Sequence, residues 1–222
     1  MSRNEGRRTR KVQESREAMA NAAVDLVLAH GLDQVTVETI SERADVSRRT
    51  FSRYFSGKED AVVDALRADF ARINAALAGR PAEESPLTAY YRALRSWLDD
   101  EPTAWHRLPR TGDLLRLLHE EPSLLPAYLR VQDEAETQSV AIVARRLGLD
   151  AENDLRPALA VSLAVGAFGT AVRFWISPGG RRALPQLIDE AFAALAAEPA
   201  PRVTTTGTGT ATTSTSKTPT TT

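Results

Sequence analysis

The chain has 222 residues, 42% of them hydrophobic, and a formal net charge of −1. A hydrophobic core can therefore form, and any affinity for nucleic acid must come from a local charged surface rather than from the overall charge. The sequence contains no cysteine, which excludes disulfides, thiol catalysis and cysteine-ligated zinc and fits a cytoplasmic location.

The two ends of the chain differ in composition from everything between them. Residues 1–11 are rich in arginine, and we expect them to form a flexible basic arm. Residues 201–222 are a threonine-rich, low-complexity segment that cannot bury apolar surface, so we expect this segment to be disordered. The longest uncharged apolar run, 158–172, is shorter than the roughly 20 residues of a membrane span, and we expect no membrane partner.

Four helices are predicted in the N-terminal part. An apolar stripe over 19–27 predicts a first helix that ends at Gly31. Thr36 is placed to cap a short second helix, and Ser47 is placed to cap a short third helix. An S-x-x-E capping box predicts the start of a fourth helix over 56–77.

Helical spacing of apolar residues continues through the C-terminal part. Further helices are predicted over 85–98, 105–119 with a kink at Pro109, 123–147, 153–176 and 184–195. No stretch alternates with the period of two that is typical of a strand. The predicted fold class is therefore all-α, with about nine helices.

Two short helices with a tight break at Asp45 and Val46, flanked by longer helices, follow the plan of a helix-turn-helix. The second short helix must bury one face and present the other to the major groove of DNA. Phe51 and Phe55 supply the buried face. Arginine can bind guanine bidentately, and the remaining surface carries Arg48, Arg49 and Arg53.

Other polar groups surround these arginines. Ser47, Thr50 and Tyr54 can donate hydrogen bonds to phosphates. Lys58 stands at the start of its helix, where its positive charge meets the positive end of the helix dipole. A contact with a DNA phosphate explains a lysine at this position better. An ordinary solvated face is the alternative, but helix lengths, caps, break and charge agree with one another, which favours DNA binding.

The segment TVETISERADVSRRTFSRYFSGKEDAV (36–62) resembles the DNA-binding domain of TetR-family repressors. The resemblance implies an all-helical homodimer, in which a helix-turn-helix domain, here 12–72, is joined to a variable ligand-binding and dimerisation domain, here 73–200. The family often has glycine in the turn where this chain has Asp45, and aspartate tolerates the left-handed conformation better than most residues. The family pattern implies base contacts by Arg48 and Arg49 and phosphate contacts by Thr36, Ser47, Thr50, Tyr54 and Lys58.

The last two predicted helices resemble the pair that forms the dimeric four-helix bundle of this family. The candidate interface residues are Gly166, Gly169, Thr170, Leu184, Leu187, Ile188 and Phe192. The alternative is that both helices complete the core of one subunit. A dimer places two recognition helices about one DNA turn apart, so we expect a near-palindromic operator.

Aromatic and aliphatic side chains of the C-terminal part are candidates to line a ligand pocket, with plain core as the alternative for each. They are Trp97, Leu114, Leu118, Tyr128, Phe168, Val172 and Trp175. Segment 132–139 is polar, and one or two of its groups are candidates to orient a ligand. The string LGLDAENDLRPALAVSLAVGAFGTAVRFW (147–175) resembles the mycofactocin-regulator-like subgroup, which implies an acyl-CoA-like effector. The candidates to bind its anionic head group are Arg110, Arg116 and Arg173, with surface solvation as the alternative.

Together these observations predict a ligand-responsive repressor that binds operator DNA as a homodimer and is released by a small hydrophobic or acyl-type effector. No catalytic motif is present and the histidines lack metal-ligand spacing, so we expect no enzyme activity, cofactor or metal. Two alternatives stay open. One is a helical small-molecule-binding enzyme with an incidental basic face, and the other is a nonspecific DNA-binding protein.

Overall fold

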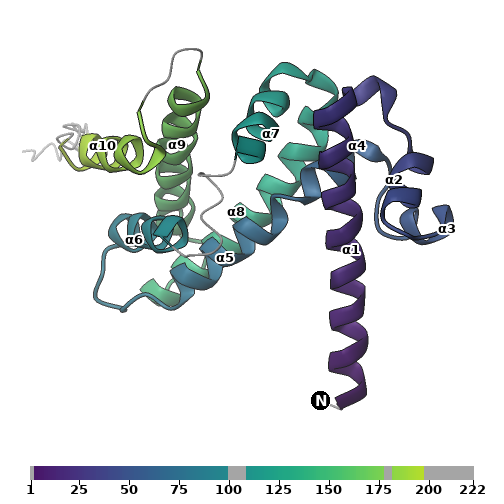
Figure 1. The fold of residues 1–222 in the computed structure, drawn as a ribbon. Coiled ribbons are helices and arrows are strands. Elements are labelled where there is room, and N and C mark those ends of the chain that lie inside the picture. The colour runs from purple at the N-terminus through teal and green to yellow at the C-terminus, as the bar shows by residue number, and fades with distance from the viewer. Residues whose placement is uncertain (1–2, 100–108, 178–181, 198–222) are drawn as a thin grey trace, which may run out of the picture.

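The computed structural model describes residues 3–99, 109–177 and 182–197, and most of them are helical (Figure 1). None of the residues in these ranges forms a β-strand, so the all-α prediction is confirmed for them. The segment 201–222, which we expected to be a disordered tail, lies outside the described residues.

The N-terminal part contains α1 (Arg3–His30), η1 (Leu32–Gln34), α2 (Val37–Arg43), α3 (Arg48–Phe51) and α4 (Lys58–Asp64). Helix α1 begins at Arg3, so it runs through the segment that we expected to be a flexible arm. Side-chain pairs one turn apart, Arg10 with Glu14 and Gln13 with Glu17, support helix in this segment. Figure 1 shows the N-terminal half of α1 standing clear of the rest of the molecule.

The predicted fourth helix is divided into α4 and α5 (Arg67–Ala78). At the junction, the amide of Leu66 donates to the carbonyl of Val63 at 3.0 Å, which is the tighter closure of a 3₁₀ turn. This division is why the described residues form ten α-helices where about nine were expected.

The C-terminal part adds α6 (Pro86–Asp99), α7 (Pro109–Glu120), η3 (Pro122–Leu124), α8 (Leu125–Leu147), α9 (Arg156–Ile176) and α10 (Leu184–Ala197). Helix α7 is described from Pro109 onward, and residues 105–108 of the predicted helix lie outside the described ranges, so the kink at Pro109 stays a prediction. Helix α5 packs against α6 and α8, and α9 packs against α6, α8 and α10.

The two parts share one hydrophobic core, because α4 packs against both α1 and α8. A polar network follows the same joint. The buried carboxylate of Asp64 accepts hydrogen bonds from Arg16 of α1 at 2.8 and 2.7 Å and from Arg67 of α5 at 2.8 Å. Arg67 also pairs with Glu134 of α8. These contacts connect α5 and α8 to α1 of the N-terminal part.

Helix α9 is the one helix in the described residues that is long and apolar enough to cross a membrane, with a mean hydropathy of 1.7 over its most apolar window. The sequence prediction counted only its uncharged run, whereas this window is longer. The core helix of a soluble protein passes the same test, and the buried face of α9 packs against α6, α8 and α10. Its composition alone is therefore weak evidence for a membrane segment.

Candidate nucleic-acid interface and ligand cavity

The turn between α2 and α3 is built by local capping. Thr36 accepts a hydrogen bond from the amide of Thr39 at 3.2 Å, and Ser47 accepts one from the amide of Thr50 at 3.1 Å. Among the described residues, Asp45 is the only non-glycine residue with a positive φ, at 52°. The predicted caps and the left-handed turn residue are confirmed, and they set the angle between the two short helices.

Helix α3 is held by two phenylalanines. Phe51 is 1% exposed and Phe55 is 5% exposed, and their ring centroids lie 5.2 Å apart. The guanidinium of Arg16 lies 5.7 Å from the centroid of Phe55 and adds a cation–π contact. Because these rings fix one face of α3 in the core, the opposite face points into solvent.

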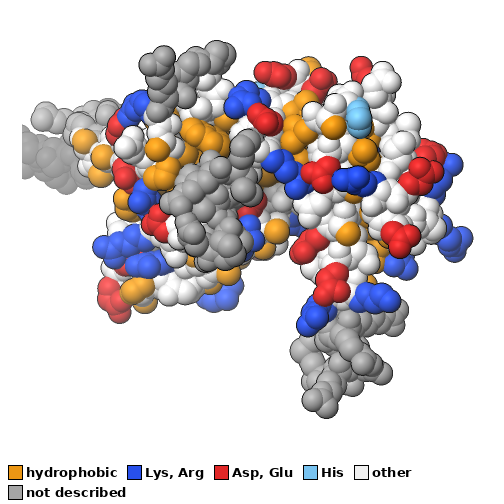
Figure 2. Space-filling view, viewed as in Figure 1, with side chains coloured by type: hydrophobic (Ala, Val, Ile, Leu, Met, Phe, Trp, Pro, Cys, Tyr) orange, Lys and Arg blue, Asp and Glu red, His pale blue; other side chains and the backbone are white. Residues whose placement is uncertain are grey.

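Three exposed arginines occupy that opposite face, and Figure 2 shows basic side chains at the edge of the molecule where α3 lies. Arg48 pairs with Glu38 at 2.7 Å, and such an exposed pair is worth only about 0–1 kcal/mol. Arg53 lies over the ring of Tyr54 and donates to its hydroxyl at 2.8 Å. Within the described residues, the side chain of Arg49 has no hydrogen-bond or ion-pair partner. This face is therefore free to bind an anion.

The predicted phosphate contacts border the arginine face. Thr36 and Ser47 are exposed, and Thr50 and Tyr54 are half-buried. The ammonium of Lys58 donates to the backbone carbonyl of Leu32 at 2.7 Å, a structural contact that the sequence did not reveal. An ammonium has three hydrogens to donate, so the contact leaves Lys58 able to bind a phosphate as well.

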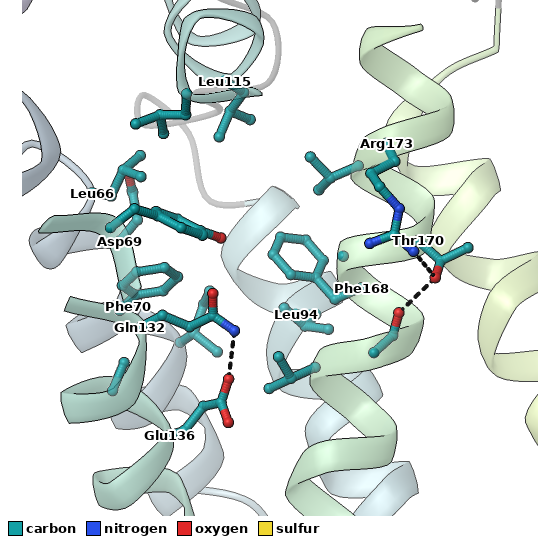
Figure 3. A pocket seen from close by; sticks show the side chains of 18 of the residues that line it. Leu66, Asp69, Phe70, Leu94, Leu115, Gln132, Glu136, Phe168, Thr170 and Arg173 are labelled. Carbon is teal, nitrogen blue, oxygen red and sulfur yellow. Dashed lines mark hydrogen bonds between the residues drawn. The ribbon is translucent and has the colours of Figure 1, made fainter. Parts of the chain in front are cut away.

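A cavity of about 650 Å³ lies between α5, α6, α7, α8 and α9 (Figure 3). Of the predicted ligand residues, Leu114 and Trp175 do not line it. Leu114 is buried elsewhere in the core, and Trp175 lies against Gly112. The predicted residues that do line the cavity are Trp97, Leu118, Tyr128, Phe168 and Val172.

Sequence reasoning missed part of the cavity wall. Leu66, Phe70, Ile73 and Tyr90 line it, although their spacing marked them only as core. The sequence could not have separated them from other core residues, because an apolar stripe looks the same whether it meets a neighbour or a void. The result is a wall rich in aromatic rings, a size and lining typical of small-molecule sites.

Two carboxylates line this apolar cavity. Burial raises the pKa of Asp69 above its usual value, although Arg72 pairs with the carboxylate and Trp97 donates to it at 3.3 Å. On α8, the side-chain amide of Gln132 donates to Glu136 at 2.6 Å, as Figure 3 shows. The polar segment 132–139 therefore does contribute groups to the cavity.

Of the arginines considered for an anionic head group, Arg173 lines the cavity, where it donates to Thr170 at 2.9 Å (Figure 3). Arg116 pairs with Asp113 on its own helix. Arg110 instead joins α7 to α1, since it pairs with Asp25 at 3.2 Å. Arg110 and Arg116 therefore do not face the cavity, and Arg110 adds a second polar link between the two parts.

The predicted dimer residues lie in two different places in the single chain. Gly166, Gly169 and Thr170 line the cavity. Leu184, Leu187, Ile188 and Phe192 are at most 8% exposed in the single chain and belong to its core, and their role in a dimer stays a prediction. The outward apolar side chains of α9 are instead Leu155, Leu159, Leu163 and Phe174, which are 71%, 54%, 41% and 63% exposed.

No cluster of three or more histidine, aspartate or glutamate side chains suited to a metal ion occurs among the described residues. His106 lies outside them.

Two protein-family models match the chain. The model for bacterial regulatory proteins of the tetR family matches residues 20–65, and the model for the MftR C-terminal domain matches residues 84–200, more than half of the chain. The regulator TcmR of Streptomyces glaucescens is 35% identical over 169 residues, which is 71% of each chain. The chain belongs to the TetR family. It is a DNA-binding transcriptional regulator and not an enzyme, so the enzyme alternative is rejected.

Solved structures of TetR-family regulators share the fold. One from Syntrophomonas wolfei is 14% identical, covers 82% of this chain and 93% of its own, and superposes with a TM-score of 0.57. FadR of Bacillus subtilis, solved in complex with stearoyl-CoA, is 16% identical, covers 81% of this chain and 97% of its own, and has a TM-score of 0.52. At these identities the likeness shows the fold alone.

Proposed function

We propose that this TetR-family regulator is a cytoplasmic repressor that binds a near-palindromic operator as a homodimer and releases it when a small, largely apolar effector fills the cavity. The observation that carries this proposal is that α4 leads into α5 through the single turn at Leu66. Helix α5 forms a wall of the cavity through Leu66, Phe70 and Ile73, and α4 packs on α1 of the DNA-binding part.

The proposed DNA surface is the outward face of α3 with its borders. Arg48 and Arg49 read bases, because their guanidinium groups are exposed at the N-terminal turn of α3. Arg53, stacked on Tyr54, lies one turn further along and contacts the DNA backbone or a base edge. The proposed phosphate contacts are Thr36, Ser47, Thr50, Tyr54 and Lys58.

The proposed dimer forms through the outer face of α9. Leu155, Leu159 and Leu163 recur every four residues and therefore form one stripe along the helix, which Phe174 extends. Apolar side chains this exposed are stabilised when a second copy covers them. Figure 1 shows α9 and α10 at the end of the molecule opposite to α2 and α3, so a partner there leaves both DNA surfaces free.

Effector binding is proposed to act through the α4–α5 junction. Leu66 stands at the 3₁₀ turn and lines the cavity, so an occupant that displaces α5 changes the angle at this junction. Asp64, two residues earlier, connects the junction to α1 through Arg16. The two DNA-binding parts then no longer match the half-site spacing. The effector shifts the equilibrium between the DNA-binding and the released arrangement. The size of this shift, as a free energy, equals the difference between its binding free energies for the two arrangements.

The cavity and the comparisons support an effector with an apolar body. A volume of about 650 Å³ lies in the range of small-molecule sites. Stearoyl-CoA in the B. subtilis FadR structure supports the acyl-type effector implied by the sequence resemblance.

The proposal is tested by sequencing the DNA fragments that the purified protein retains from its own genome, followed by gel shifts on the recovered site. We expect a near-palindromic site and a loss of affinity of about 10–100-fold for Arg49→Ala, since one base contact is worth about 1–3 kcal/mol. Arg145→Ala, an exposed arginine on α8, is the matched control. Equal affinity for random DNA would instead establish the nonspecific DNA-binding alternative.

A further inference from the structure

Glu136 is a carboxylate of the cavity wall with no cation beside it among the described residues. One of its carboxylate oxygens accepts a hydrogen bond from Gln132 at 2.6 Å, and the other has no hydrogen-bond partner among the described residues. Within the same residues, no lysine, arginine or histidine nitrogen lies within 4.0 Å of this carboxylate. Figure 3 shows Glu136 on α8, facing the space between α8 and α9.

Other carboxylates in the interior are treated differently. Asp64 accepts from two arginines, and Asp69, on the neighbouring helix α5, is paired with Arg72. A carboxylate in a protein interior is normally compensated in this way, because burying its charge without a partner costs several kcal/mol. Glu136, which is half-buried, therefore differs from Asp64 and Asp69 in having no counter-charge among the described residues.

A ligand without a positive charge that fills the cavity must desolvate the Glu136 carboxylate without pairing with it, which costs free energy. An apolar or anionic ligand that fills the cavity displaces the water around the carboxylate and leaves it paired with Gln132 alone. Tyr128 supplies no positive charge to balance Glu136. Burial and then the charge of Glu136 raise the pKa of Tyr128, so its phenol stays neutral. An ammonium group removes the cost by pairing with Glu136, and the faces of Phe70, Trp97 and Phe168 suit a cation.

The arginine on the far wall does not cancel this charge. Arg173 lines the cavity but is exposed to solvent and donates to Thr170 on its own helix. A ligand gains little by pairing with such an exposed cation. The half-buried carboxylate on α8 is the group that discriminates between ligands.

We infer that the effector is an organic cation, in which an apolar body fills the aromatic cavity and an amine or ammonium group pairs with Glu136. This inference rests on the proposed function and names the chemical class of its effector. It favours an amine over the acyl-type effector that the sequence resemblance implied.

The test compares three ligands with one hydrocarbon chain and different head groups: decylamine, decanol and decanoate. Isothermal titration calorimetry on the full chain gives their affinities. We expect decylamine to bind at least about tenfold more tightly than decanoate. Glu136→Gln should remove this preference by weakening decylamine and strengthening decanol and decanoate, since the uncompensated charge is gone. Asp133→Asn, which removes a charge from the exposed side of α8, should leave all three affinities unchanged.

Three results overturn the inference: equal or tighter binding of decanoate, binding of none of the three, or an unchanged decylamine affinity in Glu136→Gln. None of them touches the proposed function, which is judged separately by the gel shift. A regulator that holds its operator and releases it on adding decanoate keeps the repressor proposal and rejects the cationic effector. Failure to bind any operator rejects the repressor proposal, whichever ligand occupies the cavity.

Discussion

The DNA-binding part and the cavity use polar side chains in opposite ways. Around α3 the polar groups point into solvent, and Arg49 has no partner among the described residues. Of the two carboxylates that line the cavity, Asp69 is paired with Arg72, whereas Glu136 has no cation beside it in the described part of the chain. A surface that binds a large, charged partner has side chains without partners in the chain. An interior site has few charged side chains, because each unpaired charge costs free energy unless the ligand neutralises it.

The two regions also differ in how far apart in sequence their components lie. The DNA-binding surface comes from one short segment, 36–58, whose caps and turn are local contacts. The cavity is assembled from five helices between Leu66 and Arg173. The DNA-binding surface should keep its shape when residues outside its segment are substituted. The shape of the cavity instead depends on how helices distant in sequence pack. The following changes separate these two kinds of dependence.

The largest effect is expected where the DNA-binding surface depends on the core. Phe51→Ala removes a ring that is 1% exposed and should cost about 3–5 kcal/mol of unfolding free energy. Urea denaturation measures this loss, and gel shifts should show DNA binding abolished. Leu129→Ala, on an exposed position of α8, should change stability by no more than about 0.5 kcal/mol. An unchanged urea midpoint for Phe51→Ala would mean that α3 is not anchored as described.

The second effect concerns assembly and leaves each region folded. Leu159→Arg places a charge in the middle of the exposed stripe on α9, which should weaken the proposed dimer by about a hundredfold, or roughly 2.8 kcal/mol. Sedimentation equilibrium should then detect monomers with unchanged helix content. Leu129→Arg is the matched control, because that leucine is 52% exposed but lies on α8. If both variants remain dimeric, the interface is elsewhere.

The third effect tests the joint between the regions. Asp64→Asn keeps the shape of the side chain but removes the charge that Arg16 and Arg67 share, and hydrogen bonds to charged groups are worth about 1.5–3 kcal/mol. We expect a stability loss of this size and a DNA-binding part that unfolds before the helices of the cavity. Hydrogen exchange resolves the two parts, with Asp133→Asn as the control. Simultaneous unfolding of both parts would show that the shared apolar core alone couples them.

Local features of the DNA-binding part could be predicted from the sequence. The caps at Thr36 and Ser47, the left-handed turn at Asp45 and the buried face of α3 involve residues at most a few positions apart. Even there the spacing misled once. The S-x-x-E box pointed to Glu59 as the partner of Ser56, but the amide of Ser56 donates to Asp60 at 3.1 Å. Neighbouring acids offer equivalent caps, so spacing alone does not choose between them.

Long-range features could not be predicted, because periodicity shows that a residue is buried but not what buries it. Leu114 and Leu118 lie one turn apart on the same stripe, yet only Leu118 lines the cavity. Leu187 and Ile188 have the spacing of an interface but are buried in their own subunit. The contact of Lys58 with Leu32 likewise joins positions that no local pattern connects.

The smallest effect lies wholly in the C-terminal part. Glu84 accepts a hydrogen bond from Arg80 at 2.9 Å and pairs with Arg92 of α6. The hydrogen bond from Arg80, opposed by burial and aided by Arg92, lowers the pKa of Glu84 from 4.5 to about 2. The folded state therefore binds this proton less readily than the unfolded state. The stabilisation is complete above a pH of about 4.5 and is lost as the pH falls towards 2.

Glu84→Gln should flatten this part of the stability profile, measured as the urea midpoint at successive pH values. Glu83→Gln removes a neighbouring exposed carboxylate and should leave the slope in place. DNA affinity at neutral pH should be the same in both variants, because Glu84 contacts Arg80, Arg92 of α6 and Arg146 of α8, none of which belongs to α1–α4. A weakened gel shift in Glu84→Gln would show that the far end of α5 is coupled to the DNA surface, so that the two regions are less separable than their contacts indicate.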